Sequence, residues 1–229
     1  MTSPVHSVRS HLHLEIEAYD ETIRRFIPDY EGMLAAAARA VAAVQPPLVL
    51  DLGAGTGALS AALLERPGVG RVELFDVDPE MLAQARARLG SYGERARFHL
   101  RSYDEPFPAC DAIAASLALH HIPTLPQKRA LFARAFEALR AGGVLVNADV
   151  TMPAGGAERD ALYRSWADHL VASGFTETRA WELFAEWAEE DTYLPLEDEL
   201  EAYAGVGFEA RCIWRQGPVA VVAARRADG

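Results

Sequence analysis

The sequence predicts an α/β fold in which helices cover both faces of a mostly parallel sheet. Five short apolar runs have the length and composition of buried strands: residues 48–52, 72–77, 97–100, 111–116 and 144–150. Segments with helical character lie between most of them: residues 56–66, 79–89 and 127–140. This alternation is typical of a doubly wound parallel sheet, and a glycine cluster marks the first strand-to-helix turn.

The flanks add helices at both ends of this core. Two helical segments, 15–26 and 30–44, precede the first strand. Gly142 and Gly143 are expected to end the helix 127–140. Beyond residue 150, three helices and two closing strands are expected: residues 157–172, 177–190, 196–204, 208–214 and 219–224.

The charge balance argues against nucleic-acid and membrane partners. The 229 residues carry a formal net charge of −11, which repels phosphate over most of the surface. The N-terminal segment lacks an apolar signal region, and no run approaches the ~18 apolar residues of a membrane span, so a cytoplasmic location is expected. Cys110 and Cys212 are expected to be buried reduced thiols, and the histidines near the N-terminus to belong to a leader.

A glycine-rich loop, DLGAGTG, spans residues 51–57 after the first strand. Glycines tolerate the dihedrals of a sharp turn and let a ligand approach the backbone, while the following helix offers amide donors. Asp76 ends the next strand, 21 residues after Gly55, where a carboxylate can accept hydrogen bonds from ribose hydroxyls. The loop also satisfies the dinucleotide fingerprint G-x-G-x-x-A, so by itself it leaves NAD and S-adenosylmethionine open.

Longer motifs favour S-adenosylmethionine over NAD, because they resemble those of a known family. VLDLGAGTGALS is similar to the first motif of class I S-adenosylmethionine-dependent methyltransferases, and LFDVDPEMLAQAR to the second. CDAIAASLALHHI and ALRAGGVLVNADV resemble the fourth and fifth strand region of that family. The flanks IRRFIPDYEGML and VGFEARCIWRQGPVAVVAARR resemble the carboxy-S-adenosylmethionine synthase-like subfamily of uncharacterised methyltransferases.

The resemblance implies a Rossmann-like, doubly wound sheet of seven strands, mostly parallel with an antiparallel last strand, and S-adenosylmethionine as cofactor. We expect a mobile leader at residues 1–14 and a single domain at 15–229. Its expected parts, in order, are a helical cap, a cofactor-binding core, a helical substrate cap and closing strands: residues 15–45, 46–150, 151–205 and 206–229.

The resemblance implies which residues contact the methionine half of the cofactor, because these residues match positions in the family's motifs. Tyr30 matches a tyrosine of the N-terminal cap that contacts the cofactor. Gly53, Ala54 and Gly55 match the loop beneath the methionine moiety. Ser116 matches a fourth-strand residue near the sulfonium.

The adenosine contacts follow in the same way. Asp76 matches the acid that binds the ribose, Val77 its apolar neighbour against adenine, and Met81 a side chain that packs on the ring. Ser102 and Tyr103 match the pair beside the adenine amine.

The chain departs from the family pattern at two places. Many relatives carry an acid where this chain has Ser102, so either Ser102 or Asp104 is expected beside adenine. The synthase holds the extra carboxylate of its cofactor with an arginine, and the matching place near Ala202 has no basic residue beside it. We therefore expect ordinary S-adenosylmethionine rather than its carboxylated form.

His120 and His121 follow the fourth strand, where the methyl acceptor is expected to face the cofactor. An imidazole can take a proton near neutral pH, so His121 is the candidate general base. The alternative is a structural role, with the imidazole bonded to a neighbouring carbonyl. No metal ligands are expected.

The tail helices are rich in aromatic and acidic residues. The aromatic spacing favours an apolar packing stripe, with a lid over a small apolar substrate as the alternative: Tyr163, Trp166, Trp181, Phe184, Trp187 and Tyr193. A run of acids is interpreted as a solvated face: Glu186, Glu189, Glu190 and Asp191.

These observations predict a methyltransferase that acts on a small-molecule acceptor, without a nucleic-acid or membrane partner. Relatives of this layout often form homodimers. Three alternatives stay open: a tRNA-modifying enzyme related to the synthase, a non-catalytic protein that binds the cofactor, and a nicotinamide-dependent dehydrogenase.

Overall fold

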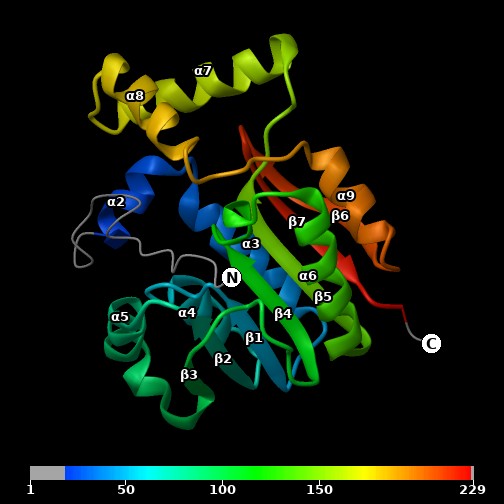
Figure 1. The fold of residues 1–229 in the computed structure, drawn as a ribbon. Helices are drawn as coiled ribbons and strands as arrows, with labels where there is room; N and C mark the ends of the chain where they lie inside the picture. The colour runs from blue at the N-terminus through cyan, green and yellow to red at the C-terminus, as the bar shows by residue number, and fades with distance from the viewer. Residues whose placement is uncertain (1–18, 228–229) are drawn as a thin grey trace.

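A computed structural model describes residues 19–227, and this part of the chain forms a seven-stranded sheet (Figure 1). The strands in chain order are β1 (Leu48–Leu52), β2 (Arg71–Asp76), β3 (Ala96–Leu100), β4 (Cys110–Ser116), β5 (Leu139–Val150), β6 (Glu209–Gln216) and β7 (Val219–Arg225). Their spatial order is β3-β2-β1-β4-β5-β7-β6. Strands β1 to β6 run in one direction and β7, paired antiparallel with β5 and β6, runs in the other, which confirms the predicted topology.

Helices cover both faces of the sheet and bury two apolar clusters. One face carries α3 (Tyr30–Ala42), α4 (Ala58–Leu64) and α5 (Pro79–Leu89), and the other carries α6 (Leu125–Ala138) and α9 (Leu196–Ala204). A further group lies beyond the sheet: α2 (Tyr19–Phe26), α7 (Gly156–Ala172) and α8 (Glu177–Trp187) (Figure 1). The short 3-10 helices are η2 (Gly90–Arg95) and η3 (Leu119–His121).

The predicted end of the helix before β5 is wrong. α6 ends at Ala138, and Leu139 already has extended dihedrals as the first residue of β5. The glycines instead permit a close approach between backbones. A Cβ added at Gly143 would lie 2.8 Å from the carbonyl oxygen of Asp111 on the neighbouring strand. The glycine pair that was expected to end a helix therefore lies within β5, where it allows this strand to pack against β4.

Two further expectations concern single residues and the N-terminus. Cys110 is buried as expected, but Cys212 is only partly buried because it lies on β6 at the edge of the sheet; both thiols are free. The leader expected at residues 1–14 lies outside the described residues. Within residues 19–227, no helix combines the length and the apolar character that a membrane crossing requires.

Candidate functional site

A pocket opens where β1 and β4 end beside one another. The chain winds in opposite directions from these two strands, and ligands of doubly wound sheets bind at such a switch point. Helices α2, α7 and α8 contribute the rest of the wall. All predicted site residues except Ser102 line the pocket: Tyr30, Gly53, Ala54, Gly55, Asp76, Val77, Met81, Tyr103, Ser116 and His121.

The glycine loop forms the floor of the pocket between β1 and α4. Gly53 and Gly55 have φ angles of 63° and 53°, which glycine adopts more readily than other residues. A Cβ at Gly53 would lie 2.6 Å from the Cβ of Ala118, so this position also needs a glycine for space. A Cβ at Gly55 would meet nothing within 4 Å, because this backbone faces open space. The loop therefore provides an exposed backbone surface that fits a closely seated ligand.

Asp76 lies at the end of β2 with its carboxylate held by the backbone. Its Oδ2 accepts a hydrogen bond from the amide of Gly55 at 2.7 Å, and its Oδ1 accepts one from the amide of Asp78 at 2.8 Å. Burial raises the pKa of Asp76, and these two bonds oppose the rise. Each carboxylate oxygen has a second lone-pair direction, so the oriented carboxylate can still accept two hydroxyl protons.

Asp51 lies beneath the loop and is almost fully buried. Its Oδ2 accepts a hydrogen bond from Ser60 Oγ at 2.6 Å. Burial raises the pKa of Asp51 to about 7, although the bond from Ser60 opposes the rise. Folding therefore makes this carboxyl group harder to ionise.

The raised pKa makes stability depend on pH. Between the ordinary pKa of 3.8 and about 7, the folded state holds a proton on Asp51 that the unfolded state has lost. The free energy of unfolding, taken relative to Asp51→Asn, should therefore fall as pH rises from 4 to 8, by on the order of 4 kcal/mol. Urea unfolding of both proteins at several pH values measures this difference, and a parallel pair of curves would contradict the expectation.

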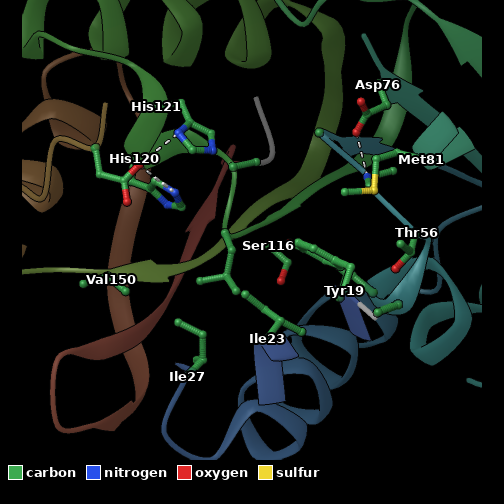
Figure 2. A pocket seen from close by; sticks show the side chains of 18 of the residues that line it. Tyr19, Ile23, Ile27, Thr56, Asp76, Met81, Ser116, His120, His121 and Val150 are labelled. Carbon is green, nitrogen blue, oxygen red and sulfur yellow. Dashed lines mark hydrogen bonds and ion pairs between the residues drawn. The ribbon is translucent and has the colours of Figure 1, made fainter. Parts of the chain in front are cut away.

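Helix α2 covers the pocket and is fastened to the glycine loop. Asp20 accepts a hydrogen bond from Thr56 Oγ1 at 2.6 Å and forms an ion pair with Arg88 of α5. Arg88 also donates to the carbonyl oxygen of Thr56 at 3.0 Å. Tyr19 and Ile23 of the same helix face the pocket (Figure 2). Burial raises the pKa of Tyr19 to about 12, so this phenol stays protonated.

The imidazoles of His120 and His121 lie at the opposite side of the pocket from Asp76 and Met81 (Figure 2). Asp149 of β5 fixes His120: its Oδ1 is 2.6 Å from His120 Nδ1, and its Oδ2 accepts from the His120 amide at 3.0 Å. Asp191 lies 3.6 Å from His120 Nε2 and 3.2 Å from His121 Nδ1. Burial lowers the pKa of His120, but Asp149 and Asp191 together outweigh it and raise the net value.

Aromatic side chains of the tail helices both pack and line the pocket. Trp166 is buried and donates from Nε1 to the carbonyl oxygen of Phe26 at 2.7 Å. Trp166, Trp187 and Tyr193 also line the pocket, so the packing and lid interpretations apply to the same residues. Trp181 does not line the pocket and is 43% exposed on α8, with its ring centre 5.5 Å from that of Phe184.

Of the two residues expected beside the adenine amine, Ser102 and Tyr103, Tyr103 lines the pocket and Ser102 does not. Ser102 Oγ instead accepts a hydrogen bond from the amide of Asp104 at 3.0 Å. The Asp104 side chain is 70% exposed and lies 3.8 Å from Arg134. Neither Ser102 nor Asp104 lines the pocket. Arg101 does line it, with its guanidinium 4.8 Å from the ring centre of Phe75.

Two acidic residues of this site, Asp149 and Asp191, are not among the predicted site residues. The signal that could have found Asp149 is a carboxylate in the buried second half of β5, residues 143–150. Asp191 was assigned to a solvated face, and this assignment is wrong: its side chain is 4% exposed and lies against the imidazoles. It follows α8 in sequence, and only the packing of that helix places it in the pocket.

The exposed glycine backbone and the oriented carboxylate of Asp76 together fit an adenosyl cofactor. This arrangement at a switch point is typical of Rossmann-like proteins that bind nucleotides. The model of a family described as "Methyltransferase domain" matches residues 49–143. Together with the relatives below, this match supports a class I S-adenosylmethionine-dependent methyltransferase with S-adenosylmethionine as its cofactor.

Individual relatives agree with this class. The chain is 28% identical over 195 residues to an "Uncharacterized methyltransferase" of Geobacillus thermodenitrificans, covering 84% of this chain and 81% of that protein. It is 26% identical to the carboxy-S-adenosyl-L-methionine synthase of Aeromonas salmonicida, covering 71% and 68%.

One solved relative extends the comparison to structure. An O-methyltransferase family 2 protein from Planctomyces limnophilus, in complex with apigenin, is 25% identical with a TM-score of 0.58. The match covers 79% of this chain and 50% of that one, so the chain spans half the length of that protein.

Proposed function

We propose that the protein transfers the methyl group of S-adenosylmethionine to a small acceptor with an apolar body and a polar reacting group. The observation that carries this proposal is the polarity of the pocket along its length. A carboxylate lies at one end, imidazoles and a second carboxylate lie at the other, and aromatic and aliphatic side chains line the space between. A small, largely apolar molecule suits such an enclosed wall.

The proposed cofactor end comprises the residues that surround the glycine loop. Asp76 accepts the ribose hydroxyls, Val77 and Met81 pack on the adenine, and Tyr103 borders the ring. The loop backbone of Gly53, Ala54 and Gly55 and the cap residue Tyr30 surround the methionine half, and Ser116 faces the sulfonium. Every one of these side chains or backbone segments lines the same pocket, which supports the assignment.

The proposed acceptor end lies at His120 and His121. The cofactor supplies an electrophilic methyl group, so the protein's task is to orient the acceptor and to handle its proton. His120 is held by Asp149, and His121 lies at the pocket surface beside Asp191. Ile23 and Ile27 of the N-terminal cap offer apolar contact to the body of the acceptor (Figure 2).

A panel of phenols, carboxylic acids and amines tests the proposed function. Each compound is incubated with the protein and S-adenosylmethionine, and release of S-adenosylhomocysteine is measured. We expect turnover with at least one apolar acceptor, by analogy with the solved relative that binds apigenin. Release only with bulk tRNA, with the steep salt dependence of phosphate contacts, would contradict the small-molecule assignment.

Replacing His121 by alanine should lower kcat by roughly 100-fold, because the acceptor loses a polar partner at its reacting atom. The affinity for S-adenosylhomocysteine should stay unchanged, since His121 lies at the far side of the pocket from Asp76. His169→Ala on α7 serves as the matched control, because His169 does not line the pocket. Unchanged turnover of the His121 variant would remove this residue from the mechanism.

A further inference from the structure

Three side chains at the acceptor end place metal-ligating atoms within 4.8 Å of one another: His120, His121 and Asp191. We propose that they hold a divalent first-row transition metal ion. Two imidazoles and one carboxylate are a ligand set that such ions favour, and one that leaves coordination positions open. The binding of the ion does not depend on the proposed function. Only the role of the ion in methyl transfer rests on that function.

The distances from Asp191 to the two imidazoles fit ligands of a common centre. Asp191 Oδ1 lies 3.2 Å from His121 Nδ1 and 3.6 Å from His120 Nε2. Ligands bound at about 2.1 Å lie roughly 3.0 Å apart at right angles and roughly 3.4 Å apart at tetrahedral angles. The two separations from Asp191 Oδ1 are close to these values, whereas the ligating nitrogens of His120 and His121, which lie within 4.8 Å of one another, would have to move closer together to share the ion.

Asp149 offers the carboxylate contact that metal-bound histidines usually make with the ring nitrogen that faces away from the metal. Its Oδ1 lies 2.6 Å from His120 Nδ1, so the carboxylate would hold a proton on Nδ1 when Nε2, the nitrogen that faces Asp191, binds an ion. Amides of Leu119 and His120 donate to the other oxygen of Asp149 at 3.1 and 3.0 Å. These bonds hold Asp149 in place and thereby orient the ring of His120.

Asp191 is positioned as firmly as the imidazoles. The amide of Thr192, the next residue, donates to the carbonyl oxygen of His120 at 2.8 Å, which joins the two segments. Tyr193 donates from its hydroxyl to Asp191 Oδ2 at 2.6 Å, so Oδ1 is the oxygen that faces the imidazoles. Contacts from distant parts of the chain thus preorganise His120 and Asp191.

The surroundings suit a cation. Asp149 and Asp191 bring two carboxylates into a nearly closed part of the pocket, with side chains that are 2% and 4% exposed. A bound divalent ion offsets these charges. Its open positions face the pocket, where an acceptor oxygen bound to it would be easier to deprotonate. The acceptor class is therefore a hydroxyl or carboxyl compound rather than an amine.

Calorimetric titration of the metal-free full chain with Zn²⁺, and visible spectra with Co²⁺, test the site. We expect one equivalent to bind the parent protein and Asp191→Asn to bind it more weakly by roughly tenfold or more. Glu189→Gln, an exposed acid two residues away, is the matched control and should equal the parent. Affinity for S-adenosylhomocysteine shows whether Asp191→Asn is folded, and His121→Gln provides a second ligand variant.

Equal Zn²⁺ affinity in the parent and in both ligand variants would overturn the site. Turnover of an acceptor by chelator-treated protein at the full rate would overturn the ion's role and leave the proposed function intact. One-equivalent binding that depends on Asp191, together with metal-dependent turnover, would support the proposal. The same binding without turnover of any acceptor would support the site and count against the proposed function.

Discussion

Asp76→Ala should weaken the affinity for S-adenosylhomocysteine by about 100-fold or more. The carboxylate is the charged acceptor proposed for both ribose hydroxyls, and hydrogen bonds to a charged group contribute roughly 1.5–3 kcal/mol each. The substitution also removes the acceptor of the Gly55 amide, which orients the glycine loop. Calorimetry at constant ionic strength measures the loss, and the shift of Tm with added ligand provides an independent reading.

A matched control separates this effect from a general loss of charge. Asp160→Ala removes an exposed acid of α7 that does not line the pocket, and its affinity should equal that of the parent. Unfolding curves without ligand show whether the Asp76 variant is folded. A folded Asp76→Ala protein that binds the ligand as tightly as the parent would exclude the proposed ribose contact.

Lys128→Met should lower the free energy of unfolding by about 3–5 kcal/mol. Lys128 of α6 lies 2.5 Å from Glu199 of α9, and each side chain is only 1% exposed. Burial raises the pKa of Glu199, while the charge of Lys128 opposes the rise. The single substitution therefore leaves a buried carboxyl group without its partner, which is the expected source of the loss. Urea unfolding measures it.

Two further variants show whether the missing partner causes the loss. Lys128→Met combined with Glu199→Leu removes both charges and should restore most of the stability, because the desolvation penalty disappears with them. Arg140→Met breaks the more exposed Arg140–Asp111 ion pair and should change stability by less than about 1 kcal/mol. A double variant no more stable than the single one would contradict this account.

Local sequence patterns predicted the elements that carry the cofactor end. The apolar run before Gly53, the acid at position 76 and the proline-initiated helix after it are all short-range signals. The structure places these residues in one pocket because parallel strands finish at the same edge of a sheet. The resemblance to methyltransferases was needed to choose between cofactors, since the glycine loop fits two classes.

The acceptor end could not be predicted in the same way. Its groups come from η3, β5 and the segment after α8, and no periodicity links residues 120, 149 and 191. Asp191 ends a run of exposed acids, so the composition of this segment suggested that the side chain of Asp191 is exposed to solvent. The bond from the Thr192 amide to His120 brings it inward, and such a contact exists only after the helices of the tail have packed.

A crystal structure of the protein with S-adenosylhomocysteine tests the central claim most directly. We expect both ribose hydroxyls within hydrogen-bond distance of Asp76 and the sulfur facing the side of the pocket that holds His120 and His121. A ligand in the reverse orientation, or one bound outside the space between the glycine loop and α2, would contradict the account.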